Sequence, residues 1–390
     1  MTNSGLVKQT KILFICNYGL LFGANRSLLT LVEYFNRNPH YLVRVIVPTK
    51  QTMYYALKEK RIDVRHYLFF PSFLYLKFML KHLLLPFTIL INTLVLPFLL
   101  FRINKFSPDI IYSNTSAENL GIIVAKILGT KHICHIREFM SLDHGAQFIF
   151  GNKAKKRYLE MSDGLIFVSE SVATNVLMGN NLNSCQKVVY NGIDSNTTTI
   201  ISKKIPSSVN IGIVGVLQES KGTLKCLAYF EQILKEHPDM VLHIYGDGYT
   251  YYKDKIAKFI ENASLQGKVV MHGFVADTKQ IYKNLDVLLM FSRSEGFGRV
   301  TIEAMLSGVP VIGFDNAGTA EIIKHGINGF LFTNYEDFQQ SMNVLLRSDD
   351  DYNKIRATAF EHAKHRFNPD RYCTEIESHL QYVLHSNPRS

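Results

Sequence analysis

Short apolar runs alternate with segments of helical spacing along the first part of this 390-residue chain. Residues 11–16 (KILFIC) form a run that is typical of a buried parallel strand, and residues 24–35 then carry apolar side chains at helical spacing. The alternation continues with a helix predicted at 52–60 and strands predicted at 42–47, 109–113, 131–135 and 164–168. This pattern predicts a parallel sheet with helices on both faces.

The second part of the chain repeats the scheme. Strands are predicted at 210–214, 241–245, 269–271, 287–291, 309–313 and 329–332, and helices at 223–235, 251–264, 278–284, 300–307 and 319–324. Between the two parts, residues 195–208 are rich in Ser, Thr and Lys and contain Pro206, as is typical of a linker. Asn368 and Pro369 precede a last helix, predicted at 370–384.

This order of strands and helices predicts two doubly wound domains. We predict an amino-terminal domain at 1–194, a linker at 195–208, a carboxy-terminal domain at 209–367, and a helix within 368–390 that crosses back to the first domain. Ligands of such sheets bind outside the carboxyl ends of the strands. We therefore expect the ligand site in a cleft between the two domains.

The alternation fails in an apolar insertion at 67–105. Its centre, residues 83–100, reads LLLPFTILINTLVLPFLL, and cations flank it on both sides: Lys77, Lys81, Arg102 and Lys105. A single membrane span would put the strands before and after it on opposite sides of a bilayer, and Pro86 and Pro97 would break up the helix. We expect a segment in the membrane interface, with a buried hairpin of core helices as the alternative.

Composition and charge narrow the class of protein. Apolar residues make up 47% of the chain and charged residues 19%, which argues against wholesale disorder. The formal net charge of +10 favours anionic partners, and no arginine-rich tract or zinc-ligand spacing indicates nucleic acid. The five cysteines are scattered, and residues 1–10 lack the apolar stretch of a signal peptide, so we expect a cytoplasmic protein with reduced thiols.

The strongest chemical signal is the segment 295–305, EGFGRVTIEAM. It follows a predicted strand and opens a predicted helix, with Glu295 at the strand end and Glu303 inside the helix. Gly296 and Gly298 allow the backbone to approach a ligand closely. The amino end of the helix offers unpaired N–H groups and a partial positive charge, which suit a diphosphate.

This pattern resembles the retaining glycosyltransferases of the GT-B fold, the family-4 group (glycosyl transferases group 1). The match extends to SGVPV at 307–311, GTAEI at 318–322 and NGF at 328–330, and upstream to segments at 215–222, 246–248 and 272–274. The resemblance is strong over 211–332 and loose in the first half. It implies an α/β, GT-B fold of two Rossmann-like doubly wound domains facing each other across a cleft, the first binding the acceptor and the second the nucleotide sugar.

The resemblance also assigns roles to donor-side residues. Glu303 should bind the ribose hydroxyls, Glu295 should act in catalysis beside the transferred sugar, and Lys221 should neutralise the leaving diphosphate. The other donor-binding residues that it implies are Gly23, Gly215, Gly246, Phe297, Gly298 and Arg299. Ordinary solvated roles for Lys221 and Glu303 are the alternatives.

One departure from the family lies at Val216, where the family commonly has an arginine as a second cation for the diphosphate. A valine side chain carries no charge and cannot take this role. We hypothesise that Arg299 or Arg293 supplies the charge instead.

In the first half, residues 19–27 follow a strand and open a helix, and they resemble the family's glycine-containing loop near the acceptor and the donor phosphate. Asn25 departs from the acidic residue often found there. The alternative is an ordinary turn with Asn25 as a helix cap. We expect Asn25 and Asn114, which follows another strand, to bind the acceptor.

The end of the strand at 131–135 carries three further candidates. His135 matches the family's histidine near the sugar and is expected to be catalytic, with a purely structural histidine as the alternative. Arg137 could bind an acceptor phosphate bidentately and Glu138 could orient either residue. Because they lie at a strand end, we expect all three side chains to reach the cleft.

The inferred reaction is transfer of a hexosyl-type unit from a nucleotide diphosphate sugar, most simply a UDP-sugar, to a hydroxyl group with retention at the anomeric carbon. Outside the acidic run at 349–351 the chain has no D-x-D motif, so we expect no cofactor and no metal ion. No second carboxylate is placed as a nucleophile, which favours front-face departure of the diphosphate.

The insertion at 67–105 predicts an acceptor that is itself bound to the membrane. A polyprenyl-diphosphate-linked sugar would fit, as in capsule, O-antigen or other surface-polysaccharide synthesis at the inner face of a bacterial cell membrane, and a glycolipid head group is the nearest competitor. A sugar-nucleotide epimerase of similar fold and a catalytically silent membrane scaffold remain open. The EGFGRV motif argues against the first, and intact Glu295, Glu303 and Lys221 argue against the second.

Overall fold

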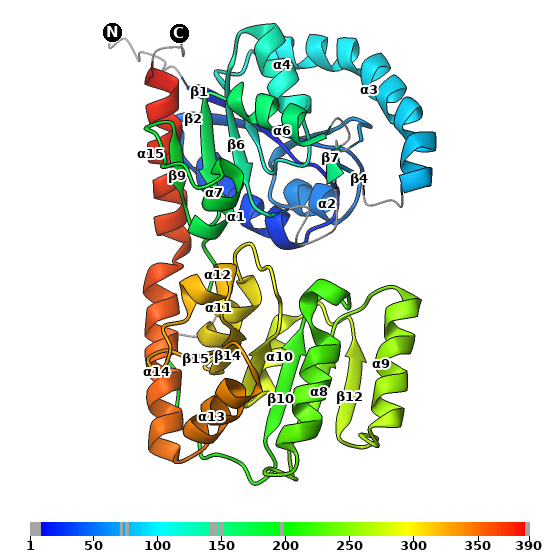
Figure 1. Ribbon diagram of the computed structural model, residues 1–390. Coiled ribbons are helices and arrows are strands. Elements are labelled where there is room, and N and C mark those ends of the chain that lie inside the picture. Colours follow the sequence, from blue (N-terminus) through cyan, green and yellow to red (C-terminus); the bar gives the residue numbers. More distant parts are fainter. Residues whose placement is uncertain are drawn as a thin grey trace, which may run out of the picture. The chain divides into compact units, whose positions relative to one another are not determined.

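The computed structural model describes residues 9–70, 73–74, 78–139, 147–148, 151–195 and 199–386. The chain divides into two compact units (Figure 1). The first comprises Met1–Gly192 with Pro369–Ser390, and the second comprises Ile193–Asn368. Each unit has its own parallel sheet with alternating helices, so the predicted α/β class is confirmed.

The first unit contains a seven-stranded sheet in the order β3-β2-β1-β5-β6-β8-β9, and every neighbouring pair is parallel. Its strands are β1 Thr10–Ile15, β2 Tyr41–Val47, β3 Asp63–His66, β5 Ile110–Ser113, β6 Lys131–Ile136, β8 Gly164–Phe167 and β9 Gln186–Val188. Its helices are α1 Gly23–Arg37, α2 Thr52–Glu59, α3 Phe78–Phe106, α4 Leu120–Leu128, α6 Gly151–Glu160, α7 Glu170–Leu177 and α15 Pro369–His385. Two short strands, β4 Phe73–Leu74 and β7 Gln147–Phe148, form an antiparallel pair.

The second unit contains a six-stranded parallel sheet in the order β12-β11-β10-β13-β14-β15. Its strands are β10 Asn210–Val214, β11 Val241–Tyr245, β12 Val269–Gly273, β13 Val287–Met290, β14 Val311–Phe314 and β15 Phe330–Phe332. Its helices are η1 Glu219–Lys221 (3-10), α8 Thr223–Ile233, α9 Thr250–Asn262, α10 Thr278–Lys283, α11 Arg299–Leu306, α12 Ala317–Ile322, α13 Tyr335–Leu345 and α14 Asp349–Arg366. The central strands read as apolar runs because helices bury both of their faces.

Both sheets reverse their strand order at a central pair, β1/β5 in the first unit and β10/β13 in the second. Loops that leave the carboxyl ends of such a pair run to opposite faces of the sheet and leave room for a ligand. The loop after β1 precedes Asn25 and the loop after β5 carries Asn114, while those after β10 and β13 carry Lys221 and Glu295. The fold therefore gathers predicted site residues at the switch point of each sheet.

The last helix, α15, packs onto the first unit (Figure 1). Its buried residues Tyr372, Ile376 and Leu380 share one hydrophobic core with Phe14 of β1 and Leu28 of α1. Two tyrosines extend this contact, because the hydroxyl groups of Tyr34 and Tyr41 both donate to the carboxylate of Glu377 in α15. The chain thus returns to its first sheet after it has built the second.

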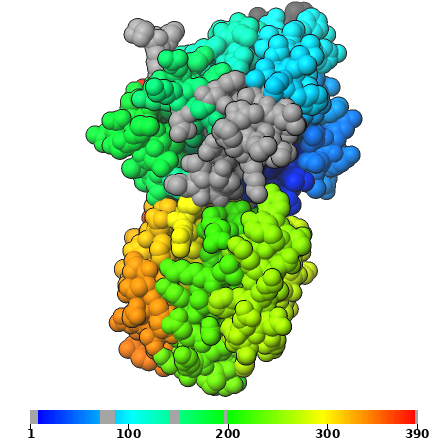
Figure 2. All heavy atoms as spheres, turned by 45° about the vertical axis from the view of Figure 1, so that its right-hand side comes forward, coloured from blue at the N-terminus to red at the C-terminus, as the bar shows by residue number. Residues whose placement is uncertain are grey.

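The apolar insertion is dominated by α3, a single helix of 29 residues that contains Pro86 and Pro97. The expectation that the prolines break the helix is wrong, as is the alternative of a buried hairpin. Pro97 cannot donate to the carbonyl group of Thr93, but Thr93 is exposed and solvent can satisfy that carbonyl. The inner face of α3 packs into a core with β1 and β5, and its outer face lies on the surface (cyan in Figure 2).

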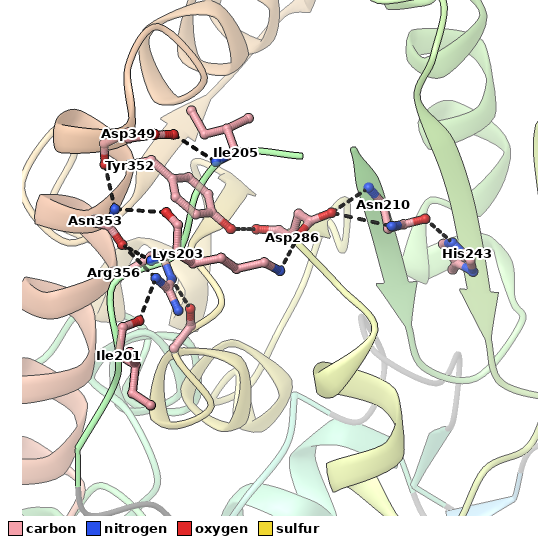
Figure 3. A network of polar contacts seen from close by, with 11 residues as sticks. Ile201, Lys203, Ile205, Asn210, His243, Asp286, Asp349, Tyr352, Asn353 and Arg356 are labelled. Carbon is pink, nitrogen blue, oxygen red and sulfur yellow. Dashed lines mark hydrogen bonds and ion pairs between the residues drawn. The ribbon is translucent and has the colours of Figure 1, made fainter. Parts of the chain in front are cut away.

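The predicted linker is fastened to the second unit over its described residues 199–208. Backbone groups of Lys203 exchange hydrogen bonds with the Asn353 side chain of α14, and the Ile205 N–H donates to Asp349. The Lys203 ammonium pairs with the buried carboxylate of Asp286, which also accepts from the Asn210 N–H (Figure 3). These contacts set the position of β10 and β13, the two strands at the switch point.

Candidate functional site

Two glycines bring the loops after β10 and β11 into backbone contact. Gly215 has a φ of 152° and Gly246 a φ of 144°. A Cβ atom on Gly246 would lie 1.7 Å from the carbonyl oxygen of Gly215, so no other residue fits there. Both predicted donor-binding glycines therefore shape the carboxyl edge of the second sheet.

The structure joins Lys221 and Glu295, which are 74 positions apart in the sequence. Lys221 ends the short helix η1, Glu295 follows β13, and Nζ lies 2.7 Å from Oε2. Their side chains are 22% and 20% exposed, so the pair is largely shielded but can still be reached from solvent. Burial acts to raise the pKa of Glu295, but the charge and hydrogen bond of Lys221 outweigh it and hold that pKa below its usual range. The carboxylate is thus ionised at neutral pH.

The loop that carries the EGFG motif is tightly held. The Gly318 N–H donates to the carbonyl oxygen of Glu295, and a Cβ on Gly318 would lie 2.7 Å from the carbonyl oxygens of Glu295 and Phe297. The Phe297 ring is buried and contacts the ring of Phe367. Gly298 is the amino-terminal cap residue of α11, so the helix begins directly after this fixed loop.

Glu303, one turn into α11, is bound by two neighbours. The Nε of Arg299 donates to Oε1 at 2.7 Å, and the hydroxyl group of Tyr282 in α10 donates to Oε2 at 3.3 Å. Tyr282 was not predicted as a site residue, because its sequence signal is no more than its place in a helix that follows a strand end. The carboxylate is oriented by these two donors.

The two arginines considered in place of the missing cation at Val216 lie in different settings. Arg299 is bonded to Glu303, whereas Arg293 is exposed and its backbone N–H donates to the Ser220 carbonyl, next to Lys221. Burial and the nearby charge of Arg293 lower the pKa of Lys225, so a second cation lies close to Arg293. The structure thus places Arg293 beside the Lys221 turn, while Val216 itself is exposed.

In the first unit, Asn25 and Asn114 are buried and bonded to each other. The amide nitrogen of Asn114 donates to Oδ1 of Asn25 at 3.0 Å, and the amide nitrogen of Asn25 donates to the carbonyl oxygens of Tyr18 and Leu20. The cap residue of α1 is Phe22 rather than Asn25. Asn25 therefore holds the loop before Gly23 instead of capping the helix.

His135 and Arg137 differ from the expectation that they reach a ligand cleft. Together with Ile133 they lie on one face of β6 and its extension, because side chains alternate along a strand, and Ile133 belongs to the core that α15 covers. His135 is fully buried, with Nδ1 2.5 Å from the Tyr112 hydroxyl and Nε2 without a partner among the described residues. Burial and the Arg137 charge hold the pKa of His135 well below its usual range, so its ring is neutral.

The Arg137 guanidinium is bound entirely within the first unit. Nε donates to the Oδ1 and backbone oxygen of Asn114, one terminal nitrogen donates to Asn191 Oδ1 at 2.5 Å, and the other donates to the Tyr372 hydroxyl at 3.0 Å. Glu138, the next residue, is half-buried. Burial and then the charge of Glu138 raise the pKa of Tyr18, which indicates that the two side chains lie near each other. The charges of Glu138 and Arg137 both act on Tyr18, so both residues lie near the loop after β1, and Glu138 is the less buried of the two.

One more carboxyl group near the carboxyl ends of the first sheet's strands was not predicted from the sequence. Glu118 is buried after β5, and its Oε2 accepts from the Gly121 N–H at 3.1 Å at the start of α4. Burial raises the pKa of Glu118 above its usual range. Within the described residues, no three His, Cys, Asp or Glu side chains are grouped so that they could hold a metal ion.

The second unit matches a known protein family. Residues 199–362 match the family model "Glycosyl transferases group 1". A poly(glycerol-phosphate) alpha-glucosyltransferase of Bacillus subtilis is 27% identical over 161 residues, which are 40% of this chain and 24% of that protein. A poly(ribitol-phosphate) alpha-N-acetylglucosaminyltransferase of Staphylococcus aureus is 33% identical over 122 residues, which are 30% of this chain and 24% of that protein. The aligned part is thus about a quarter of each relative.

The fold of the whole chain has a solved counterpart. HepE of Anabaena, crystallised in complex with UDP, matches with a TM-score of 0.76 and 23% identity over 96% of this chain and all of that one. The GT-B fold that the sequence predicted is therefore confirmed. The resemblance to the group 1 glycosyltransferases is confirmed for the second unit, where the family model matches.

Proposed function

We propose that this protein is a retaining hexosyltransferase that moves a sugar from a UDP-sugar to a hydroxyl group of a membrane-associated, polyprenyl-diphosphate-linked acceptor in surface-polysaccharide synthesis. The observation that carries the proposal is the joining of Lys221 to Glu295 at the switch point of a sheet that matches glycosyltransferases, with Glu303 in α11, the helix that follows. Cations, an oriented carboxylate and a helix amino end together form a diphosphate-sugar site.

UDP is the donor nucleotide that the comparisons favour. HepE, which shares the fold, was crystallised with UDP. Both curated relatives bear names that specify alpha-linked products. Because common UDP-hexoses are themselves alpha-linked, an alpha product means retention, and we carry this outcome over to the present protein.

The residues fit a front-face mechanism without a metal ion. The bond between the anomeric carbon and the diphosphate oxygen breaks, the acceptor oxygen bonds to the same face, and its proton passes to the departing diphosphate. Lys221 and the amino end of α11 stabilise the charge that develops on that diphosphate. In this mechanism Glu295, whose ionised form Lys221 stabilises, accepts hydrogen bonds from sugar hydroxyl groups.

The membrane-bound acceptor is inferred from α3. Its outer face exposes a continuous apolar stripe, formed by Phe87, Leu90, Leu94, Phe98 and Phe101. By length and composition alone, the part Pro86–Phe106 could cross a membrane. However, β3 and β5 flank the insertion and belong to one sheet, so a single crossing between them is impossible. We propose that the stripe lies in the lipid interface at the inner face of the cell membrane, with Arg102 and Lys105 toward anionic head groups.

Replacing Leu94 by Glu is expected to abolish co-flotation of the protein with vesicles of phosphatidylglycerol and phosphatidylcholine. Leu94 is 68% exposed at the centre of the stripe, so the change puts a charge into the lipid contact without disturbing a packed core. Ile201→Glu, at an exposed apolar residue of the second unit, is the control and should float like wild type. Equal flotation of wild type and Leu94→Glu would contradict the proposal.

A donor screen tests the reaction itself. We expect UDP to raise the melting temperature and GDP, ADP and CMP to leave it unchanged at equal concentration, because bound ligand stabilises only the folded protein. Incubation with radiolabelled UDP-hexoses and polyprenyl-diphosphate-linked acceptors should then label the lipid. Turnover of the UDP-sugar without any acceptor would point to an epimerase instead, and no shift with any nucleotide would point to a silent scaffold.

A further inference from the structure

Arg137 occupies the point where the chain leaves and re-enters the first unit. The unit ends at Gly192 and resumes at Pro369, and a Cβ on Gly192 would lie 2.5 Å from the Cα of Pro369. Arg137 donates hydrogen bonds to Asn191 and Tyr372, so it binds both segments within three residues of these points. Its guanidinium thus links the two passages of the chain, which are the segment that leaves the first unit at Gly192 and the segment that returns to it at Pro369.

The third partner of Arg137 is Asn114, which lies at the carboxyl ends of the strands, the edge of the sheet where ligands bind (the ligand edge). Nε donates to Oδ1 of Asn114, which obliges the Asn114 amide nitrogen to face Asn25. Oδ1 of Asn25 accepts this bond, so the Asn25 amide nitrogen in turn faces the carbonyl oxygens of Tyr18 and Leu20. Each amide can satisfy its neighbours in only one orientation, and the donor at Arg137 selects that orientation.

The chain of contacts is shielded from water along its length. Asn25, Asn114 and Tyr372 are fully buried, and Arg137 is 6% exposed. Water cannot easily replace a missing partner in such a network, so the loss of one bond is passed on to the next group. The three side chains to which Arg137 donates, Asn114, Asn191 and Tyr372, are uncharged, so neutral acceptors set its hydrogen-bond geometry.

We propose that Arg137 is a positioning residue, which holds the loop after β1 (residues 17–23) in a fixed relation to the two passages of the chain. The inference rests on the proposed function, since this loop lies at the ligand edge of the first unit. It replaces the expectation that Arg137 binds an acceptor phosphate. Asn25 and Asn114 transmit the constraint instead of contacting the acceptor.

Tyr372→Phe tests this with the least disturbance, because the buried ring is retained and the hydroxyl group that accepts from Arg137 is removed. We expect amide hydrogen exchange in residues 17–25 to rise and kcat for sugar transfer to fall about tenfold, as for one hydrogen bond to a charged group, while the Kd for UDP stays unchanged. Tyr41→Phe is the matched control, because it removes a hydroxyl bond to Glu377 of α15 elsewhere on the same helix. It should leave exchange in residues 17–25 and kcat unchanged.

Arg137→Lys provides a second variant, because lysine keeps the charge but lacks the planar guanidinium whose spread nitrogens reach Asn114, Asn191 and Tyr372 together. It should show the same rise in exchange at residues 17–25. Exchange that rises only in α15 and residues 189–192, with kcat equal to that of Tyr41→Phe, would overturn the proposal. If wild type transfers no sugar but exchange at residues 17–25 still responds, the proposed function fails and the positioning role of Arg137 stands.

Discussion

Replacing Glu303 by alanine is expected to weaken UDP binding about a hundredfold and to abolish the thermal shift that UDP produces. The carboxylate is held by Arg299 and Tyr282, so it is oriented before a ligand arrives. Two ribose hydroxyl groups donating to it would form two hydrogen bonds to a charged group, each worth about 1.5–3 kcal/mol. Their joint loss accounts for a hundredfold or more in Kd.

The same variant separates this role from an ordinary surface glutamate. If Glu303 served only its pairing with Arg299 at i and i+4, the change would cost about 0.2–0.5 kcal/mol of stability and leave UDP affinity intact. Glu231→Ala in α8, at an exposed position of the same unit, is the control for removal of a helical carboxylate. Calorimetric titration with UDP decides whether Glu303 binds the ribose or only pairs with Arg299. An unchanged Kd in Glu303→Ala would show that Glu303 in α11 does not bind the donor.

Helices and strands could be predicted from the sequence where the pattern of apolar residues reflects which side chains are buried. The strands β1, β10 and β13 are buried on both faces and appear in the sequence as apolar runs. The outermost strands β3 and β9 were not predicted, because DVRH and QKV are short and only partly buried and carry no such run. The continuity of α3 was also missed, since a proline on an exposed helix face costs less than the same residue in a packed interior.

Site residues could be predicted where a motif lies next to one strand end, and not where partners come from distant segments. Glu295 and Glu303 follow β13 directly, so the motif places them at the switch point. The pairing of Glu295 with Lys221 depends on contact between two loops, which no local spacing encodes. The burial of His135 and Arg137 depends on which face of β6 is covered by α15, and strand alternation alone does not decide between the two faces.

Replacing Lys221 by alanine is expected to lower kcat for sugar transfer by about 10²–10³, with a smaller effect on UDP affinity. This is the range measured when a preorganised donor to developing charge is removed, and in the proposed mechanism Lys221 stabilises charge on the leaving diphosphate. Lys253→Ala is the control, because Lys253 forms an exposed ion pair with Asp247 in the same unit. It should leave kcat within a factor of two of wild type.

The pH dependence of stability gives an independent check on the Lys221–Glu295 pair. In wild type the pKa of Glu295 is depressed, so the pair stabilises the fold above the pH where glutamate titrates when unfolded, and this contribution is lost as the pH falls. In Lys221→Ala, only the hydrogen bonds from Ser292 and Gly298 still oppose burial, so the pKa of Glu295 rises relative to wild type. The variant's stability deficit should therefore shrink as the pH is lowered from 7 towards 5. Adding Glu295→Gln to Lys221→Ala should restore stability at pH 7, because it removes the unpaired carboxylate, but should not restore kcat. Recovery of kcat in the double variant would show that Lys221 acts only by neutralising Glu295 and not on the diphosphate.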